Sequence, residues 1–152
     1  MAISIKSINF RDRKTKNFQK NLVNRRGDAL IEAVTLHRRF PYSVLACFFF
    51  LDKGAAEDHT PKRRSTFLNA HARLRMFLGR SDPADRDEQY ERMYLLLLDA
   101  GKRKHSIRAY AVGDPAQPLG LEKVFDDLMV LVAERNPDFY ECEGGTLRRV
   151  PG

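Results

Sequence analysis

The sequence predicts an α/β protein, a mixed β-sheet flanked by helices in the order β-α-β-α-β-β-α. Apolar runs of strand length recur along the chain, amphipathic stretches of helical length separate them, and residues typical of turns mark the boundaries. With 152 residues, 43% of them hydrophobic and 31% charged, we expect a single domain over residues 1–152. A frayed tail is expected over residues 141–152.

The first strand is expected at the very start of the chain, in AISIKSINF. Alternation places Ile3 and Ile5 on one face and Ser4 and Lys6 on the other, and its interruption near Ile8 predicts a bulge or the strand end. A lysine on a half-buried strand is unfavourable unless it faces water or a ligand. From the residues alone, the favoured interpretation is an edge strand whose polar face is wet.

A basic stretch, a helix and a buried strand follow. Residues 11–26 are polar and basic, and they predict a loop followed by a short helix. A longer helix is expected over residues 28–39, with Asp28 as its N-cap and Pro41 as its stop. The almost continuous apolar run at 42–51 predicts a central strand that is covered on both faces.

The second half of the chain repeats the alternation of helix and strand. A helix is expected over residues 66–78 with Ser65 as its cap, followed by strands at 93–100 and 106–113 that are joined as a hairpin. An amphipathic helix is expected over residues 121–136. Its inward positions are predicted to be Leu121, Val124, Phe125, Leu128 and Leu131.

The positive charge is concentrated near the N-terminus. Residues 1–26 carry eight basic side chains and one acidic side chain, whereas residues 81–152 carry ten basic and fourteen acidic side chains. Such a patch attracts polyanions, with nucleic acid first among them, and the alternative is a solubilising surface. The predicted nucleic-acid-binding residues are Arg11, Arg13, Lys14, Lys16, Lys20, Arg25 and Arg26.

Common catalytic signatures are missing from the sequence. It has no phosphate-binding GxxxxGK[ST] or GxGxxG, no GxSxG and no HExxH, and its histidines do not share metal-ligand spacing. His37 is interpreted as a packed core histidine. The acidic residues between 82 and 91 are interpreted as a solvated loop.

The composition also bears on location. No apolar run approaches the roughly 20 residues that span a bilayer, and the N-terminus does not read as a signal peptide. The two cysteines, Cys47 and Cys142, lie far apart, which favours reduced thiols. A cytoplasmic protein without a membrane partner is expected.

One long run carries a family resemblance. ISIKSINFRD and, further on, NRRGDALIEAVTLHRRFPYSVL resemble the C-terminal half of a bacterial restriction-endonuclease-like family in the PD-(D/E)xK nuclease superfamily. The core of that superfamily runs α-β-β-β-α-β and carries a [DE]-x-K element on its third strand. The resemblance implies that Ser4-Ile5-Lys6 stands at this element, residues 28–39 at the following helix and residues 42–51 at the next strand.

The resemblance implies DNA as the partner, a role in defence, and endodeoxyribonuclease chemistry with Mg²⁺ as cofactor. Its catalytic candidates are Lys6, Ser4 and Glu32. Ser4 departs from the family, which has Asp or Glu there, and the metal-binding Asp of the preceding strand has no counterpart. Glu32 on the helix is the one carboxylate expected within reach of Lys6. A nuclease truncated at its amino end, with an incomplete metal site, is therefore expected.

Two alternatives remain at this point. The chain is either a non-catalytic nucleic-acid-binding module or a protein-interaction module that oligomerises through its N-terminal strand. In the second case, the partner is another copy of the chain or a second chain that completes the sheet.

Overall fold

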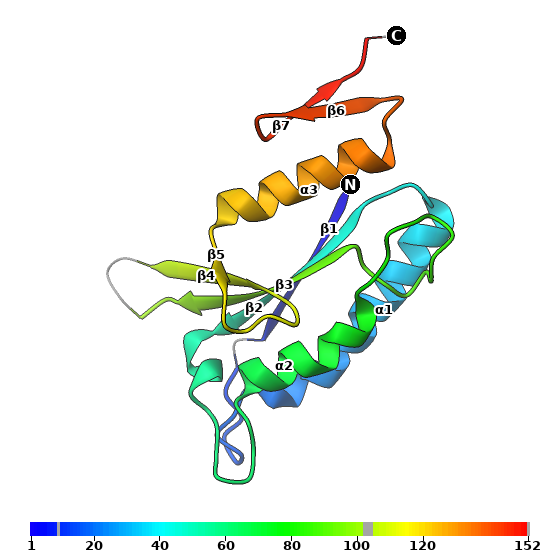
Figure 1. Cartoon of the computed structure of the whole chain (residues 1–152). Helices are drawn as coiled ribbons and strands as arrows, with labels where there is room; N and C mark the ends of the chain where they lie inside the picture. The colour runs from blue at the N-terminus through cyan, green and yellow to red at the C-terminus, as the bar shows by residue number, and fades with distance from the viewer. Residues whose placement is uncertain (9, 102–104, 152) are drawn as a thin grey trace.

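A computed structural model describes residues 1–8, 10–101 and 105–151 as a five-stranded mixed sheet with three α-helices (Figure 1). The strand order is β1-β2-β3-β4-β5; the first three strands are parallel, whereas β4 and β5 pair antiparallel. The bounds are β1 (Ala2–Ile8), β2 (Leu45–Asp52), β3 (Arg92–Asp99), β4 (Ser106–Ala111) and β5 (Pro118–Leu119). The mixed α/β class is thereby confirmed, and the short β5 adds to the expected order.

Helices cover the two faces of the sheet. α1 (Leu22–Arg39) and α2 (Thr66–Leu74) pack on one face, where their buried residues share an apolar cluster with β2 and β3. α3 (Leu121–Arg135) packs on the opposite face through Val124, Leu128 and Val132. β2 is buried along nearly its whole length, as expected for a strand covered on both faces.

The helix expected at residues 28–39 begins earlier, at Leu22. Leu22 is fully buried and shares one face with Ala29 and Ala33, so the apolar spacing that holds the helix continues through Gly27. Asp28 is therefore inside the helix rather than at its cap, and its carboxylate pairs with Arg25 at 2.9 Å.

β1 is an edge strand that, among the described residues, pairs only with β2. Its alternation is regular up to its end at Ile8, and the buried positions are Ser4, Lys6 and Ile8. The expectation of a wet polar face is wrong, because this face lies under α1. The apolar face is the exposed one, with Ile5 at 65% exposure, because the cluster beneath α3 contains no β1 side chain.

The remaining differences concern helix faces and ends. α2 begins as expected, since the Ser65 hydroxyl accepts a hydrogen bond from the Leu68 amide at 3.3 Å, but it gives way to a 3₁₀ turn after Leu74. On α3, Leu121 and Phe125 are more than a third exposed, because the buried stripe runs through Val124, Leu128 and Val132 instead.

The last residues form a hairpin rather than a frayed tail. β6 (Tyr140–Glu143) and β7 (Thr146–Arg149) pair antiparallel beside α3 (Figure 1). Gly144 and Gly145 have positive φ angles of 56° and 74°, which a tight two-residue turn requires and glycine adopts readily. The expected connection between β3 and β4 lies partly outside the described residues. None of the described helices is long and apolar enough to cross a bilayer.

Candidate functional site

The structure brings Ser4, Lys6 and Glu32 together. Ser4 and Lys6 stand two residues apart on the face of β1 that α1 covers, and Glu32 reaches them from the helix. The Ser4 hydroxyl donates to Glu32 Oε2 at 2.5 Å, and Lys6 Nζ forms an ion pair with Glu32 Oε1. The side chain of Lys6 is only 9% exposed, whereas that of Glu32 is 42% exposed. Glu32 therefore pairs with a buried ammonium group while its own carboxylate remains partly in contact with solvent.

Two weak acids border this trio. Cys47 lies opposite Ser4 in the β1–β2 register, and Tyr90 donates its hydroxyl to the Ala29 carbonyl at 2.7 Å. Burial raises the pKa of the Cys47 thiol to about 12 and also raises the pKa of Tyr90 above its ordinary value. Both groups are neutral at physiological pH, so Cys47 is a packed thiol rather than a nucleophile.

The donor set does not fit a Mg²⁺ site. Mg²⁺ demands near-octahedral oxygen coordination, usually including one or two carboxylates. Here both oxygens of Glu32 are already bonded, one to Ser4 and one to Lys6. Within the part of the chain that the structure describes, no three His, Cys, Asp or Glu side chains are grouped to hold a metal. No chemical step of this centre is therefore assigned to a metal.

The basic segment, residues 11–26, follows β1 as a compact turn and the start of α1. The Asp12 carboxylate accepts hydrogen bonds from the amides of Lys14 and Thr15 at 3.0 and 2.8 Å. The pKa of Asp12 lies well below its ordinary value, mainly because of the hydrogen bond from the Thr15 amide and then because of the Lys20 side chain. Asp12 thus stays ionised and fixes the turn that displays the basic side chains.

The predicted nucleic-acid-binding residues fall into two groups. Lys20 pairs with Asp12 at 3.1 Å and Arg25 pairs with Asp28 at 2.9 Å, so part of their charge is compensated within the chain. The other five form no ion pair among the described residues, and all but the half-buried Arg26 are exposed. These five are Arg11, Arg13, Lys14, Lys16 and Arg26.

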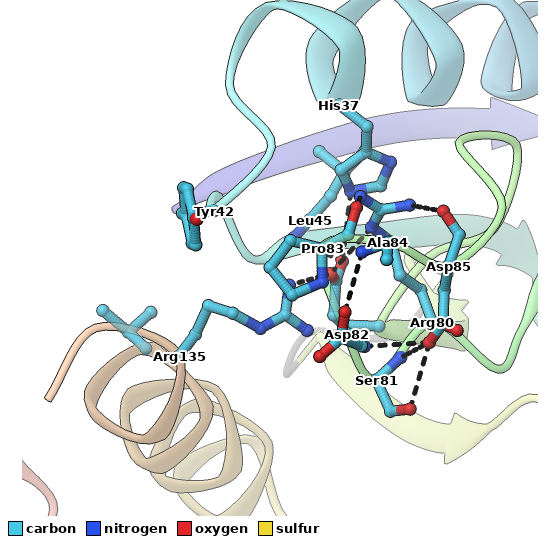
Figure 2. A network of polar contacts seen from close by, with 12 residues as sticks. His37, Tyr42, Leu45, Arg80, Ser81, Asp82, Pro83, Ala84, Asp85 and Arg135 are labelled. Carbon is cyan, nitrogen blue, oxygen red and sulfur yellow. Dashed lines mark hydrogen bonds and ion pairs between the residues drawn. The ribbon is translucent and has the colours of Figure 1, made fainter.

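A second polar network, which the sequence does not reveal, lies at the start of β2 and β3. Figure 2 shows side chains from α1, the loop before β3 and α3 converging there. Its centre is the buried carboxylate of Glu91, which accepts from the Leu45 amide at 2.9 Å and from Arg135 at 3.1 Å. His37 Nε2 lies 3.4 Å and Arg80 Nε 3.5 Å from the same carboxylate.

This network holds elements together. Burial alone would raise the pKa of Glu91, but the nearby His37 ring and the hydrogen bond from the Leu45 amide lower it overall, so the carboxylate remains ionised. The Arg80 guanidinium also donates to the carbonyls of Asp85 and Pro83 at 2.5 and 2.8 Å, which fastens the loop. The interpretation of this acidic stretch as a solvated loop is wrong at Glu91.

His37 has the packed role that its helical position predicts. Its ring is buried, and Nδ1 lies 3.0 Å from the Asp87 carbonyl, so His37 joins α1 to the loop before β3. Glu91 offers no comparable signal in the sequence, because Leu45, His37 and Arg135 reach it from β2, α1 and α3. Comparison of the chain with protein-family models, curated proteins and solved structures gives no match.

Proposed function

We propose that this chain is a DNA-binding domain of the restriction-endonuclease-like type with an incomplete nuclease centre. The observation that carries the proposal is the contact of Ser4 and Lys6 on β1 with Glu32 on α1, next to the basic segment. In a metal-dependent phosphodiesterase, a lysine beside a carboxylate stabilises the charge that develops on the phosphate. Both oxygens of Glu32 are already bonded to Ser4 and Lys6, so metal-dependent cleavage would require acidic ligands from a second chain.

The charge of the basic segment supports DNA as the partner. Five of its cations lack a carboxylate partner among the described residues, and the turn that carries four of them is fixed by Asp12. A fixed, uncompensated cluster of cations suits the phosphate backbone, which is read by charge and position rather than by base identity. We therefore expect binding to duplex DNA that depends little on sequence.

Salt dependence tests this function. If the five cations each neutralise one phosphate, the plot of log K against log salt for a short labelled duplex should have a slope of about −4.5 or steeper. Replacing Arg13 and Lys14 with alanine should flatten that slope by about 2. The matched control is Lys123→Ala with Arg149→Ala, which removes two exposed cations from the acidic half of the chain. A slope near zero, or no binding at low salt, would contradict the function.

A second candidate function, homodimerisation, is favoured by a separate observation. The outer edge of β1 has no strand partner among the described residues, and the neighbouring side chains of Ile3 and Ile5 are 37% and 65% exposed. Antiparallel pairing of β1 with β1 of another copy is self-complementary and would satisfy both edges at once. The oligomeric state in solution decides this candidate.

A further inference from the structure

The loop between β2 and α2 carries a second group of cations. The backbones of Thr60 and Arg63 exchange hydrogen bonds of 2.8 and 3.0 Å, which places Pro61 and Lys62 at the tip of a tight turn. Lys62 and Arg64, on either side of Arg63, are exposed. With His59, they line a hollow of about 460 Å³, which is roomy enough for a phosphate group.

This loop is held beside the basic segment by the buried carboxylate of Asp58. Asp58 accepts from the Phe18 amide at 3.0 Å and, on the other side, from the amide and hydroxyl of Thr66, both at 2.6 Å. Its backbone carbonyl accepts from Arg63. Asp58 therefore connects the end of the 11–17 turn to both ends of the 59–64 loop.

A second connection runs through Gln19. Its side-chain carbonyl lies 3.5 Å from Arg63 Nη1 and 3.3 Å from Asn69 Nδ2. Figure 1 shows the two loops at the same end of the molecule, beyond the carboxyl ends of β1 and β2. The 11–17 turn borders its own hollow of about 530 Å³, which is lined by Arg11, Arg13 and Lys14.

The three cations of the 59–64 loop differ in whether they are paired within the chain. Arg63 is committed to internal contacts with Asp58 and Gln19, whereas Lys62 and Arg64 form no ion pair with any described residue. Like charges that are held close together repel each other unless an anion lies between them or nearby. A polyanion with evenly spaced phosphates is the ligand that such an arrangement suits.

We infer that the 59–64 loop is a second phosphate-binding site for DNA, and that Asp58 and Gln19 hold it beside the 11–17 turn to form one continuous basic face. Lys62 and Arg64 contact phosphates, while Asp58 and Gln19 are positioning residues. The inference rests on the DNA-binding function proposed above and extends it to a segment beyond the N-terminal basic region.

The test compares salt dependence among variants of the full chain on the same labelled duplex. With Lys62 and Arg64 added to the five cations of the basic segment, the wild-type slope should be about −6, and Lys62→Ala with Arg64→Ala should return it to about −4.5. Lys123→Ala with Arg149→Ala is the matched control and should leave the slope unchanged. Far-ultraviolet circular dichroism checks that each variant is folded.

Gln19→Ala tests the positioning role separately, because it removes no charge and leaves Asp58 in place. Affinity at low salt should fall for this variant, whereas affinity for free inorganic phosphate, which needs only one loop, should stay the same. A wild-type slope near −4.5 that the Lys62/Arg64 variant does not change would overturn the inference and leave the proposed function standing. Absence of salt-dependent binding by the wild-type chain would overturn both.

Discussion

Lys6 is a buried lysine on the edge strand β1. Its ammonium group lies under α1, on a strand face that would normally be apolar, and Glu32 is its carboxylate partner. Burial of a charge is unfavourable unless it is paired, so the position of Lys6 depends on Glu32. The reverse dependence is weaker, because Glu32 is partly exposed and water can replace its partner.

This asymmetry gives a prediction for stability. Glu32→Gln should lower the free energy of unfolding by about 2–3 kcal/mol, because it leaves the buried ammonium without a carboxylate. Lys6→Met should cost only about 1 kcal/mol, since the freed carboxylate can hydrate. Urea denaturation of both variants, and of the double variant, measures the difference.

The control is the exposed Arg25–Asp28 pair, for which Asp28→Asn should change stability by no more than about 0.5 kcal/mol. Equal and small losses for Glu32→Gln and Lys6→Met would contradict the claim that Lys6 is held by Glu32. Partial recovery in the double variant, relative to Glu32→Gln alone, would support it.

Residue patterns predicted part of the Ser4–Lys6–Glu32 contact and part of the network around Glu91. Alternation alone places Ser4 and Lys6 on one face of β1, and helical spacing alone places His37 on the inner face of α1. The meeting with Glu32 was expected only through the family resemblance, because strand and helix patterns do not give the register between them. Glu91 was missed because its partners are far apart in sequence, and an acidic residue beside a loop usually lies in water.

At the scale of elements, β1 explains why one expectation failed. The sequence pattern distinguishes two faces of a strand, but which face is buried depends on where the helices pack. α1 crosses over the polar face, and α3 lies over the inner strands instead of over Ile3 and Ile5. The start of α1 was misplaced for a related reason: Asp28 is a favourable N-cap residue, whereas the burial of Leu22 extends the helix to an earlier start.

The open edge of β1 leads to a prediction about assembly. Ile5→Asp should shift the chain toward monomer in sedimentation velocity, because it places charge in the apolar face that a second copy would cover. Ile31→Asp is the matched control, since Ile31 is about equally exposed but lies on α1 rather than on the edge strand. A wild-type chain that stays monomeric at the highest concentration reached would rule out pairing through β1.

At the scale of the whole molecule, basic and acidic residues are concentrated in different parts of the fold. The basic loops gather at the carboxyl ends of β1 and β2, whereas α3 and the β6–β7 hairpin belong to the half in which acidic residues outnumber basic ones (Figure 1). If the chain binds DNA as proposed, this polarity would orient it with the basic loops toward the DNA. The overall charge bias was predictable from composition, but the approach of residues 59–64 to residues 11–17 depends on Asp58 and had no sequence signal.

The central claim joins DNA binding with a centre that lacks the carboxylates for cleavage. Incubation of the chain with supercoiled plasmid in Mg²⁺ at low salt, followed by electrophoresis with and without protein removal, tests both parts together. We predict that the plasmid migrates more slowly while the chain is bound and runs as intact supercoiled DNA once the chain is removed. Nicked or linear DNA that appears with the wild-type chain but not with Lys6→Ala, or a plasmid that is never retarded, would contradict the account.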